Sequence, residues 1–224
     1  MSCLRIWRHK RTDAARSRIK IAAMSESDRA QRHRVRMQRK KEVVDAAIAR
    51  ADRTQGLLLI LTGNGKGKSS SAFGMLARAL GYGMRIGVAQ FIKGRSDTGE
   101  EAFFRKQDNV VWHVLGEGFT WDTQNLERDT ETARRGWTVV QTMLRDPSID
   151  LIVLDELTYP LKFGWLDLNT VLRDLKNRPP MQHVVITGRG APEALCDAAD
   201  TVTEMTDVKH AFRAGIQAQR GIDL

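Results

Sequence analysis

The stretch LLLILTGNGKGKSSSAFG, which begins at Leu57, constrains the fold of this chain more than any other segment. Its aliphatic start predicts a buried strand over Leu57–Leu61, and its end predicts a helix over Ser69–Leu80 that glycines at 81 and 83 stop. The loop between them is rich in glycine, lysine and serine. Because a strand, a glycine-rich loop and a helix in this order are typical of phosphate-binding loops, we expect an α/β domain.

The residue types in this loop explain why it would hold phosphate. Glycines let backbone N–H groups converge on an anion, and the start of the following helix adds positive partial charge. Lys68 would reach phosphate oxygens, and the Ser69 hydroxyl would bind Mg²⁺ (or Mn²⁺). The usual motif has glycine seven residues before this serine, where the chain has Thr62. The predicted ATP-binding residues are Gly63, Asn64, Gly65, Lys66, Gly67, Lys68, Ser69 and Ser70.

The rest of the chain alternates apolar runs with helical patterns. Leu126–Leu144 has apolar residues at helical spacing, and Trp137 in this segment is expected in the core. We therefore predict an α/β fold of the P-loop NTPase (RecA) type over residues 56–224, with a mostly parallel sheet flanked by helices. Further strands are expected at Arg85–Ile92, Val110–Leu115, Leu151–Leu154, Val184–Thr187 and Thr201–Glu204.

Two acidic residues follow the apolar run in LIVLDELTY. Asp155 and Glu156 would sit at a strand end and position Mg²⁺ together with Ser69. The structural alternative is that Asp155 caps the next turn. Glu156 could also serve as the base of an ordinary ATPase or kinase that releases ADP, and the residues considered so far do not exclude that function.

A basic arm precedes the predicted domain. Residues 1–55 hold 16 Lys and Arg against six Asp and Glu, whereas the rest of the chain holds 20 against 21. Residues 1–23 are interpreted as a disordered arm, a transit-like peptide or an extension upstream of a true start at Met24. Residues 29–53 predict a helix. The arm is either a solvated segment, a lid over an anionic ligand or a nucleic-acid contact, of which the last is least favoured.

Composition also bears on location. The longest aliphatic run, Leu57–Leu61, is too short to span a bilayer, so no membrane is expected. No apolar signal region follows the first residues, and secretion is therefore not expected. Cys3 and Cys196 are the only cysteines, and neither forms a Cys-x-x-Cys pair. These features favour a reducing compartment, and we expect a cytoplasmic protein.

A predicted loop with two aromatic residues follows the third strand. In GEGFTWDTQN, Phe119 and Trp121 stand beside Gly116 and Gly118. Large aromatic side chains on a loop either pack into the core or contact a ligand. The residues alone leave both possibilities open.

Several long blocks of the chain together resemble the ATP:corrinoid adenosyltransferases of bacterial cobalamin synthesis and salvage. They run in order from about Gly56 to the C-terminus: TGNGKGKSSSAFG, VAQFIKG, GEGFTWDTQN, VLDELTYP, VVITGRG and VKHAFRAGIQAQRGID. The arm from Met24 also resembles the family's N-terminal helix, whereas residues 1–23 lie outside the resemblance. Many members have two threonines where this chain has Ser69 and Ser70, and the hydroxyl groups are kept.

The resemblance implies a reaction at the ribose end of ATP. The cobalt(I) of cob(I)alamin, or of cob(I)yrinic acid a,c-diamide, would attack C5′ and tripolyphosphate would leave. Cobalt(I) has no proton to lose, so no general base is expected. Lys66 and Lys68 would stabilise the charge on the departing triphosphate. In the family the triphosphate lies with reversed polarity relative to ordinary phosphate-loop enzymes.

The resemblance also implies a corrinoid site and partners. Phe119 and Trp121 would lie against the lower face of the corrin and keep a lower ligand off cobalt. The arm would fold over the site of a partner subunit in a homodimer, and a flavoprotein-type donor would supply electrons. Independently of the resemblance, Arg189 in TGRG follows a strand end, where ligands of open parallel sheets bind, and is a candidate contact for nucleotide or corrin. His210, in the matching VKHAF block, is a second candidate, although a structural role is the commoner one for such a histidine.

Overall fold

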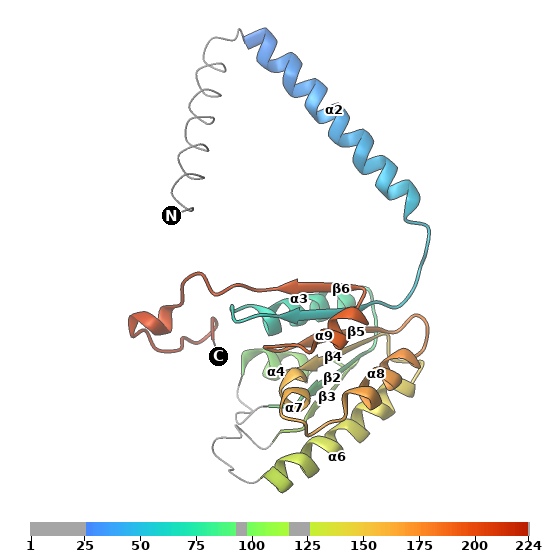
Figure 1. The fold of residues 1–224 in the computed structure, drawn as a ribbon, viewed down its shortest axis with the longest axis vertical. Coiled ribbons are helices and arrows are strands. Elements are labelled where there is room, and N and C mark those ends of the chain that lie inside the picture. Colours follow the sequence, from blue (N-terminus) through green and yellow to red (C-terminus); the bar gives the residue numbers. More distant parts are fainter. Residues whose placement is uncertain (1–25, 93–97, 117–125, 224) are drawn as a thin grey trace, which may run out of the picture. The chain divides into compact units, whose positions relative to one another are not determined.

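The computed structural model describes residues 26–92, 98–116 and 126–223, and the chain divides into two compact units, 1–53 and 54–224 (Figure 1). The first unit contains helix α2 (Glu26–Arg50), which begins and ends three residues before the predicted helix. Within the described chain, none of its residues is buried. Its exposed surface carries an ion pair one turn apart, between Lys41 Nζ and Asp45 Oδ2 (2.5 Å). Among the described residues, no helix is long and apolar enough to cross a membrane.

The second unit is built on a six-stranded sheet with the order β3-β2-β4-β5-β1-β6. Every neighbouring pair is parallel, which confirms the predicted parallel α/β fold. The bounds differ from the predicted ones by at most two residues. The strands are β1 (Leu58–Thr62), β2 (Ile86–Gln90), β3 (Val110–Val114), β4 (Leu151–Asp155), β5 (His183–Thr187) and β6 (Thr201–Glu204).

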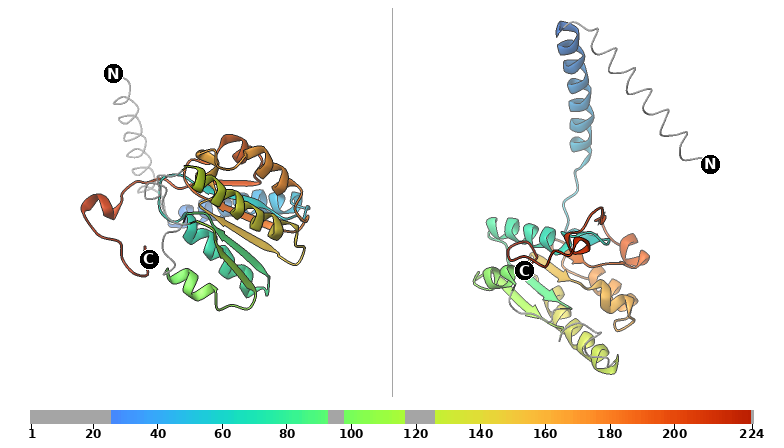
Figure 2. Two further views of the ribbon diagram at one scale, coloured as in Figure 1. Left: turned by 90° about the horizontal axis from the view of Figure 1, so that it is seen from below. Right: turned by 90° about the vertical axis from the view of Figure 1, so that its left-hand side faces the viewer.

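Helices cover both faces of this sheet (Figure 2). On one face, α3 (Lys68–Gly81) and α4 (Gly99–Phe104) enclose a core with Phe73 and Trp112. The opposite face is covered by α6 (Leu126–Arg145), α8 (Leu168–Lys176) and α9 (Glu193–Asp197). Trp137 is 4% exposed in that second core, as predicted. The remaining helices are the short α7 (Thr158–Lys162) and the 3₁₀ helix η1 (Ala211–Ala214).

The parallel arrangement decides where the predicted site residues lie. The carboxyl ends of all six strands fall on one edge of the sheet, because every pair runs in the same direction. Strand β5 separates β1 from β4, so Thr187 at its end lies between the phosphate loop and the two acidic residues. Ligands of open parallel sheets bind outside this edge.

Candidate active site at the carboxyl edge of the sheet

The phosphate loop joins β1 to α3, and its shape requires glycine. Gly63 and Gly67 have φ of 92° and 105°, a conformation that side chains disfavour. A Cβ at Gly63 would lie 2.4 Å from the Met205 carbonyl oxygen, and one at Gly65 would lie 2.8 Å from the same oxygen. The Gly65 amide donates a hydrogen bond to this oxygen (2.7 Å). The chain after β6 therefore packs directly on the loop.

Thr62 replaces the first glycine of the usual motif without breaking the loop. It ends β1 in register with Glu204 of β6. Its Oγ1 accepts a hydrogen bond from the Ala191 amide (3.3 Å), in the segment that follows β5. The departure from the motif thus adds a contact between two loops at the carboxyl edge.

The two predicted catalytic lysines have different environments. Lys68 opens α3, is 6% exposed, and its Nζ donates to the Gly65 carbonyl oxygen (2.6 Å). Burial lowers the pKa of Lys68, while the nearby carboxylates of Glu156 and Asp155 oppose that shift. The side chain of Lys66 is half exposed and forms an ion pair with Asp223 near the C-terminus. The Lys68 ammonium therefore contacts the loop itself, whereas the Lys66 ammonium contacts an acidic residue near the C-terminus.

The Asp155 carboxylate is buried at the end of β4 and accepts two hydrogen bonds. Thr187 Oγ1 donates to Oδ1 (2.7 Å), and Gln90 Nε2 donates to Oδ2 (3.0 Å). The alternative that Asp155 caps the next turn is wrong, because α7 begins after Leu157 and has no side-chain cap. The next residue, Glu156, follows β4 and carries the second carboxylate of the site.

Glu156 combines backbone strain with an unpaired buried oxygen. It has φ of 59°, and among the described residues no other non-glycine residue has a positive φ. Its Oε2 is buried and has no hydrogen-bond partner in the described chain. Burial, and then the neighbouring Asp155 charge, raise the pKa of Glu156 to about 7, against the opposing influence of Lys68 and Arg189.

Arg189 lies in a glycine loop beside these groups. Its charge acts on the pKa of both Lys68 and Glu156, and its carbonyl oxygen accepts from Thr158 Oγ1 (3.0 Å). A Cβ at Gly188, which has φ of 139°, would lie 2.0 Å from that hydroxyl oxygen. The loop after β5 is therefore fixed on the start of α7, with Arg189 near the phosphate loop.

The donor atoms at this edge fit a hard divalent cation. Within the described chain, no group of three or more His, Cys, Asp and Glu side chains could hold a metal by itself. Mg²⁺ usually binds one or two carboxylates and completes its coordination with substrate phosphates and water. The unpaired Oε2 of Glu156 is a ligand atom of this kind, and the Ser69 hydroxyl in the first turn of α3 supplies another.

Three further residues of the predicted site are Phe119, Trp121 and His210. Phe119 and Trp121 fall outside the described residues, so the structure leaves their role a prediction. Gly116 is the last described residue before them, and a Cβ there would lie 2.3 Å from the Phe91 carbonyl oxygen. His210 precedes η1, and its Nδ1 accepts from the Phe212 amide (3.1 Å), which is a structural contact.

The sequence analysis missed other residues of this site. Gln90 and Thr187 contact Asp155, and Asp223 contacts Lys66. Thr187 and Gln90 both end apolar strands, and a search for polar residues at strand ends would have found them. Asp223 had no comparable signal.

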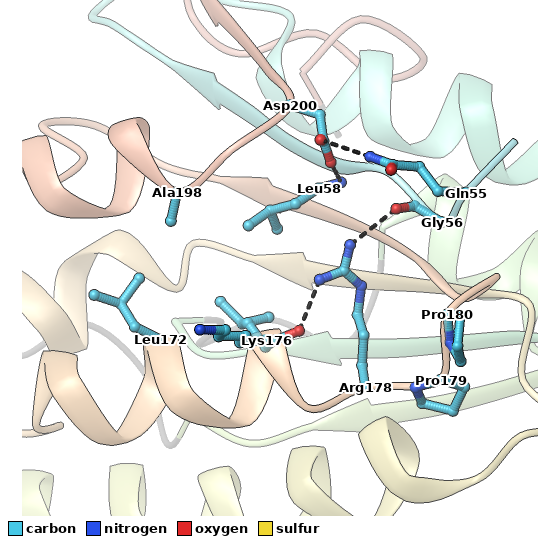
Figure 3. Close-up of a pocket in the computed structure, with 11 residues that line it drawn as sticks. Gln55, Gly56, Leu58, Leu172, Lys176, Arg178, Pro179, Pro180, Ala198 and Asp200 are labelled. Atoms are coloured by element: carbon cyan, nitrogen blue, oxygen red, sulfur yellow. Dashed lines mark hydrogen bonds between the residues drawn. The ribbon is translucent and has the colours of Figure 1, made fainter. Parts of the chain in front are cut away.

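A cavity of about 560 Å³ opens at the opposite edge of the sheet, near the starts of β1, β5 and β6 (Figure 3). Two charged side chains that line it, Arg178 and Asp200, are occupied by hydrogen bonds. The Arg178 guanidinium donates to the carbonyl oxygens of Gly56 (3.1 Å) and Leu175 (2.7 Å), and Asp200 accepts from Gln55 and from the Leu58 amide. These hydrogen bonds connect the start of β1 to Arg178, which precedes β5, and to Asp200, which precedes β6.

The fold and the site at its carboxyl edge define a phosphate-loop α/β protein. Residues 54–224 match the family described as ATP:corrinoid adenosyltransferase BtuR/CobO/CobP, and residues 23–48 match the family described as Cob(I)alamin adenosyltransferase N terminal. The chain belongs to the ATP:corrinoid adenosyltransferase family. The resemblance seen in the sequence is confirmed.

Known relatives match over most of their length. The corrinoid adenosyltransferase of Pseudomonas aeruginosa is 59% identical over 202 residues, which cover 89% of this chain and all of the relative. That of Escherichia coli K12 is 47% identical, covering 86% of this chain and 98% of the relative, and that of Sinorhizobium sp. is 42% identical, covering 90% and 95%. Among solved structures, the flagellar accessory protein FlaH of Methanocaldococcus jannaschii aligns over 67% of this chain and 71% of its own, with a TM-score of 0.43 and 13% identity, too weakly to support an inference.

Proposed function

We propose that this protein transfers the 5′-deoxyadenosyl group of ATP to the cobalt(I) of a corrinoid in adenosylcobalamin biosynthesis or salvage. The cobalt(I) electron pair forms a bond to C5′, the C5′–O bond breaks, and its electrons leave with tripolyphosphate. The observation that carries this proposal is the family match over residues 54–224, with 59% identity to a corrinoid adenosyltransferase along that relative's whole length.

The residues of the phosphate loop suit this reaction because they can stabilise the leaving group. Lys68 and Lys66 are the catalytic groups in the proposal, and each would offer an ammonium to the triphosphate. Amides of the loop from Gly63 to Gly67 would contribute further hydrogen bonds. Preorganised donors of this kind are typically worth about 3 kcal/mol of barrier each.

The divalent cation would neutralise charge on the triphosphate when it is bound. Ser69, Glu156 and Asp155 are the residues that would hold it. The unpaired Glu156 Oε2 supports this assignment, since a buried carboxylate oxygen without a partner is costly unless a ligand satisfies it. Because cobalt(I) attacks without losing a proton, Glu156 has no base role in this scheme.

The corrinoid would lie near the aromatic loop. Phe119 and Trp121 would cover its lower face and exclude a lower ligand, which makes cobalt(II) easier to reduce. Arg189 is a further candidate contact for ATP or corrinoid, since its charge acts on Lys68. The chain would work as a cytoplasmic homodimer with the basic arm over the partner's site, and a flavoprotein-type donor would reduce the cobalt.

Product analysis separates this function from an ordinary ATPase or kinase. The protein is incubated with ATP, Mg²⁺ and chemically reduced cob(I)alamin, and the products are followed by absorbance and by phosphorus NMR. We expect a cobalt–carbon product in equal amount to tripolyphosphate. Release of ADP without an alkylated corrinoid would show that the alternative function is correct.

A further inference from the structure

A chain of hydrogen bonds connects four neighbouring strands beneath the candidate site. Trp112 Nε1 on β3 donates to Gln90 Oε1 on β2 (3.1 Å), and Gln90 Nε2 donates to Asp155 Oδ2 on β4 (3.0 Å). From the other side, Thr187 Oγ1 on β5 donates to Asp155 Oδ1 (2.7 Å). All four side chains are buried, so each hydrogen bond is made away from water.

Thr187 uses its hydroxyl group twice in this network. The hydroxyl has one proton, which goes to Asp155, and a lone pair, which accepts the Glu156 amide N–H (3.0 Å). A hydroxyl can act as donor and acceptor at once, whereas an aliphatic side chain can do neither. Thr187 therefore holds two successive acidic residues through one oxygen atom, and it is fully buried.

The Glu156 backbone needs this restraint. Its φ of 59° lies in the left-handed region, which costs a non-glycine residue about 1–2 kcal/mol. Such conformations persist where the surroundings determine them strongly, and they are concentrated at functional sites. The hydrogen bond from the Glu156 amide to Thr187 restrains this turn immediately after β4, together with the Tyr159 amide, which donates to the Glu156 carbonyl oxygen (3.3 Å).

The restraint has a consequence for the carboxylate. Glu156 Oε2 is buried without a protein partner in the part of the chain that the structure describes, while Lys68 and Arg189 both act on its charge. The carboxylate is therefore close to the phosphate loop and keeps an oxygen available there. Asp155, by contrast, has a protein donor on each oxygen.

We propose that Thr187 is a positioning residue for the divalent cation: it fixes the Asp155 carboxylate and the Glu156 backbone so that Glu156 Oε2 faces the cation bound with the triphosphate. This inference rests on the proposed function only for its ligands, ATP and a divalent cation. Partners of this kind, which orient a metal ligand without touching the metal, typically change metal affinity 10- to 100-fold when mutated.

The test measures Mn²⁺ binding to the ATP complex of the full-length protein by electron paramagnetic resonance. We expect Thr187→Val, which keeps the shape and removes both hydrogen bonds, to weaken Mn²⁺ binding at least about tenfold. ATP affinity without metal, measured in EDTA, should stay within about twofold. Thr187→Ser restores the hydroxyl and should return Mn²⁺ affinity to near the wild-type value.

Thr158→Val is the matched control. Thr158 is also fully buried, and its hydroxyl donates to the Arg189 carbonyl oxygen, not to either acidic residue. We expect this variant to lose stability without losing Mn²⁺ affinity. If Thr187→Val does not fold, as judged by circular dichroism, Thr187→Cys replaces it, because a thiol is only a weak donor and acceptor.

The proposal is overturned if the Val or Cys variant binds Mn²⁺ as tightly as the wild type, or if Thr187→Ser binds it as weakly as they do. An equal loss of affinity in Thr158→Val would also overturn it. These outcomes are separate from the proposed function, because the Mn²⁺ titration contains no corrinoid. A wild-type protein that releases ADP would refute adenosyl transfer and leave this comparison intact.

Discussion

At the scale of single residues, Glu156 makes stability depend on pH. Its pKa is raised from 4.5 to about 7, chiefly by burial, so the folded protein keeps this proton at pH values where the unfolded chain has lost it. The protonated group is therefore favourable to folding below about pH 4.5, and this contribution disappears as the pH rises through 7. By linkage, this single group lowers the free energy of unfolding by about 3 kcal/mol between pH values below 4.5 and pH values above 7.

The variant Glu156→Gln tests this dependence. Without ATP or metal, it should raise the free energy of unfolding by about 1–3 kcal/mol at pH 8 and change it little at pH 4. Denaturant unfolding across this pH range provides the measurement. Glu131→Gln, on the exposed part of α6, is the control and should leave the profile unaltered. Equal effects of Glu156→Gln at both pH values would contradict a raised pKa of Glu156 in the folded protein.

At the scale of elements, the segment after β6 occupies groups that the phosphate loop would offer to ATP. The Met205 carbonyl oxygen accepts the Gly65 amide, and the Asp223 carboxylate pairs with Lys66. The hydrogen bond with Lys66 lowers the pKa of Asp223. In the proposed function, ATP would therefore compete with an acidic side chain of the same chain for the Lys66 ammonium group.

Removing this competitor should favour nucleotide binding. We expect Asp223→Asn to tighten binding of tripolyphosphate and of ATP up to about fivefold, the range that an exposed ion pair allows. Isothermal titration calorimetry at low salt measures the change, which should shrink at high salt. Asp223→Glu keeps the charge and should bind like the wild type. Weaker binding of Asp223→Asn would mean that the residue assists the ligand.

At the scale of the whole molecule, the proposed function joins a nucleotide site to a corrinoid site. The double variant Phe119→Ala and Trp121→Ala should lower the rate most when cobalt(II) must be reduced on the protein. The loss should be smaller with chemically prepared cobalt(I), because the reduction step that the two aromatic side chains would assist is then bypassed. Rates of adenosylation with the two corrinoid supplies provide the comparison. Equal losses would exclude the proposed aromatic role.

Features that depend on neighbouring residues could be predicted from the amino-acid sequence. The six strands, the loop and helix α3 follow from apolar runs and from glycines at 63 and 67 that the backbone needs. Helices α4, α7, α8 and α9 were not assigned, because short helices owe their stability to tertiary packing. For α8 a local signal existed, since the Asp167 side chain accepts the Thr170 amide as an N-cap.

Which polar groups come together depends on long-range packing. Gln90, Asp155 and Thr187 are far apart in the sequence and become neighbours because β2, β4 and β5 lie side by side. Strand order depends on how the helical connections cross the sheet, and local periodicity carries no information about that choice. The contact of Asp223 with Lys66 likewise requires the chain after β6 to return to the loop. Local pattern determined the loop that would hold a triphosphate, while the long-range packing of the sheet determined which side chains surround it.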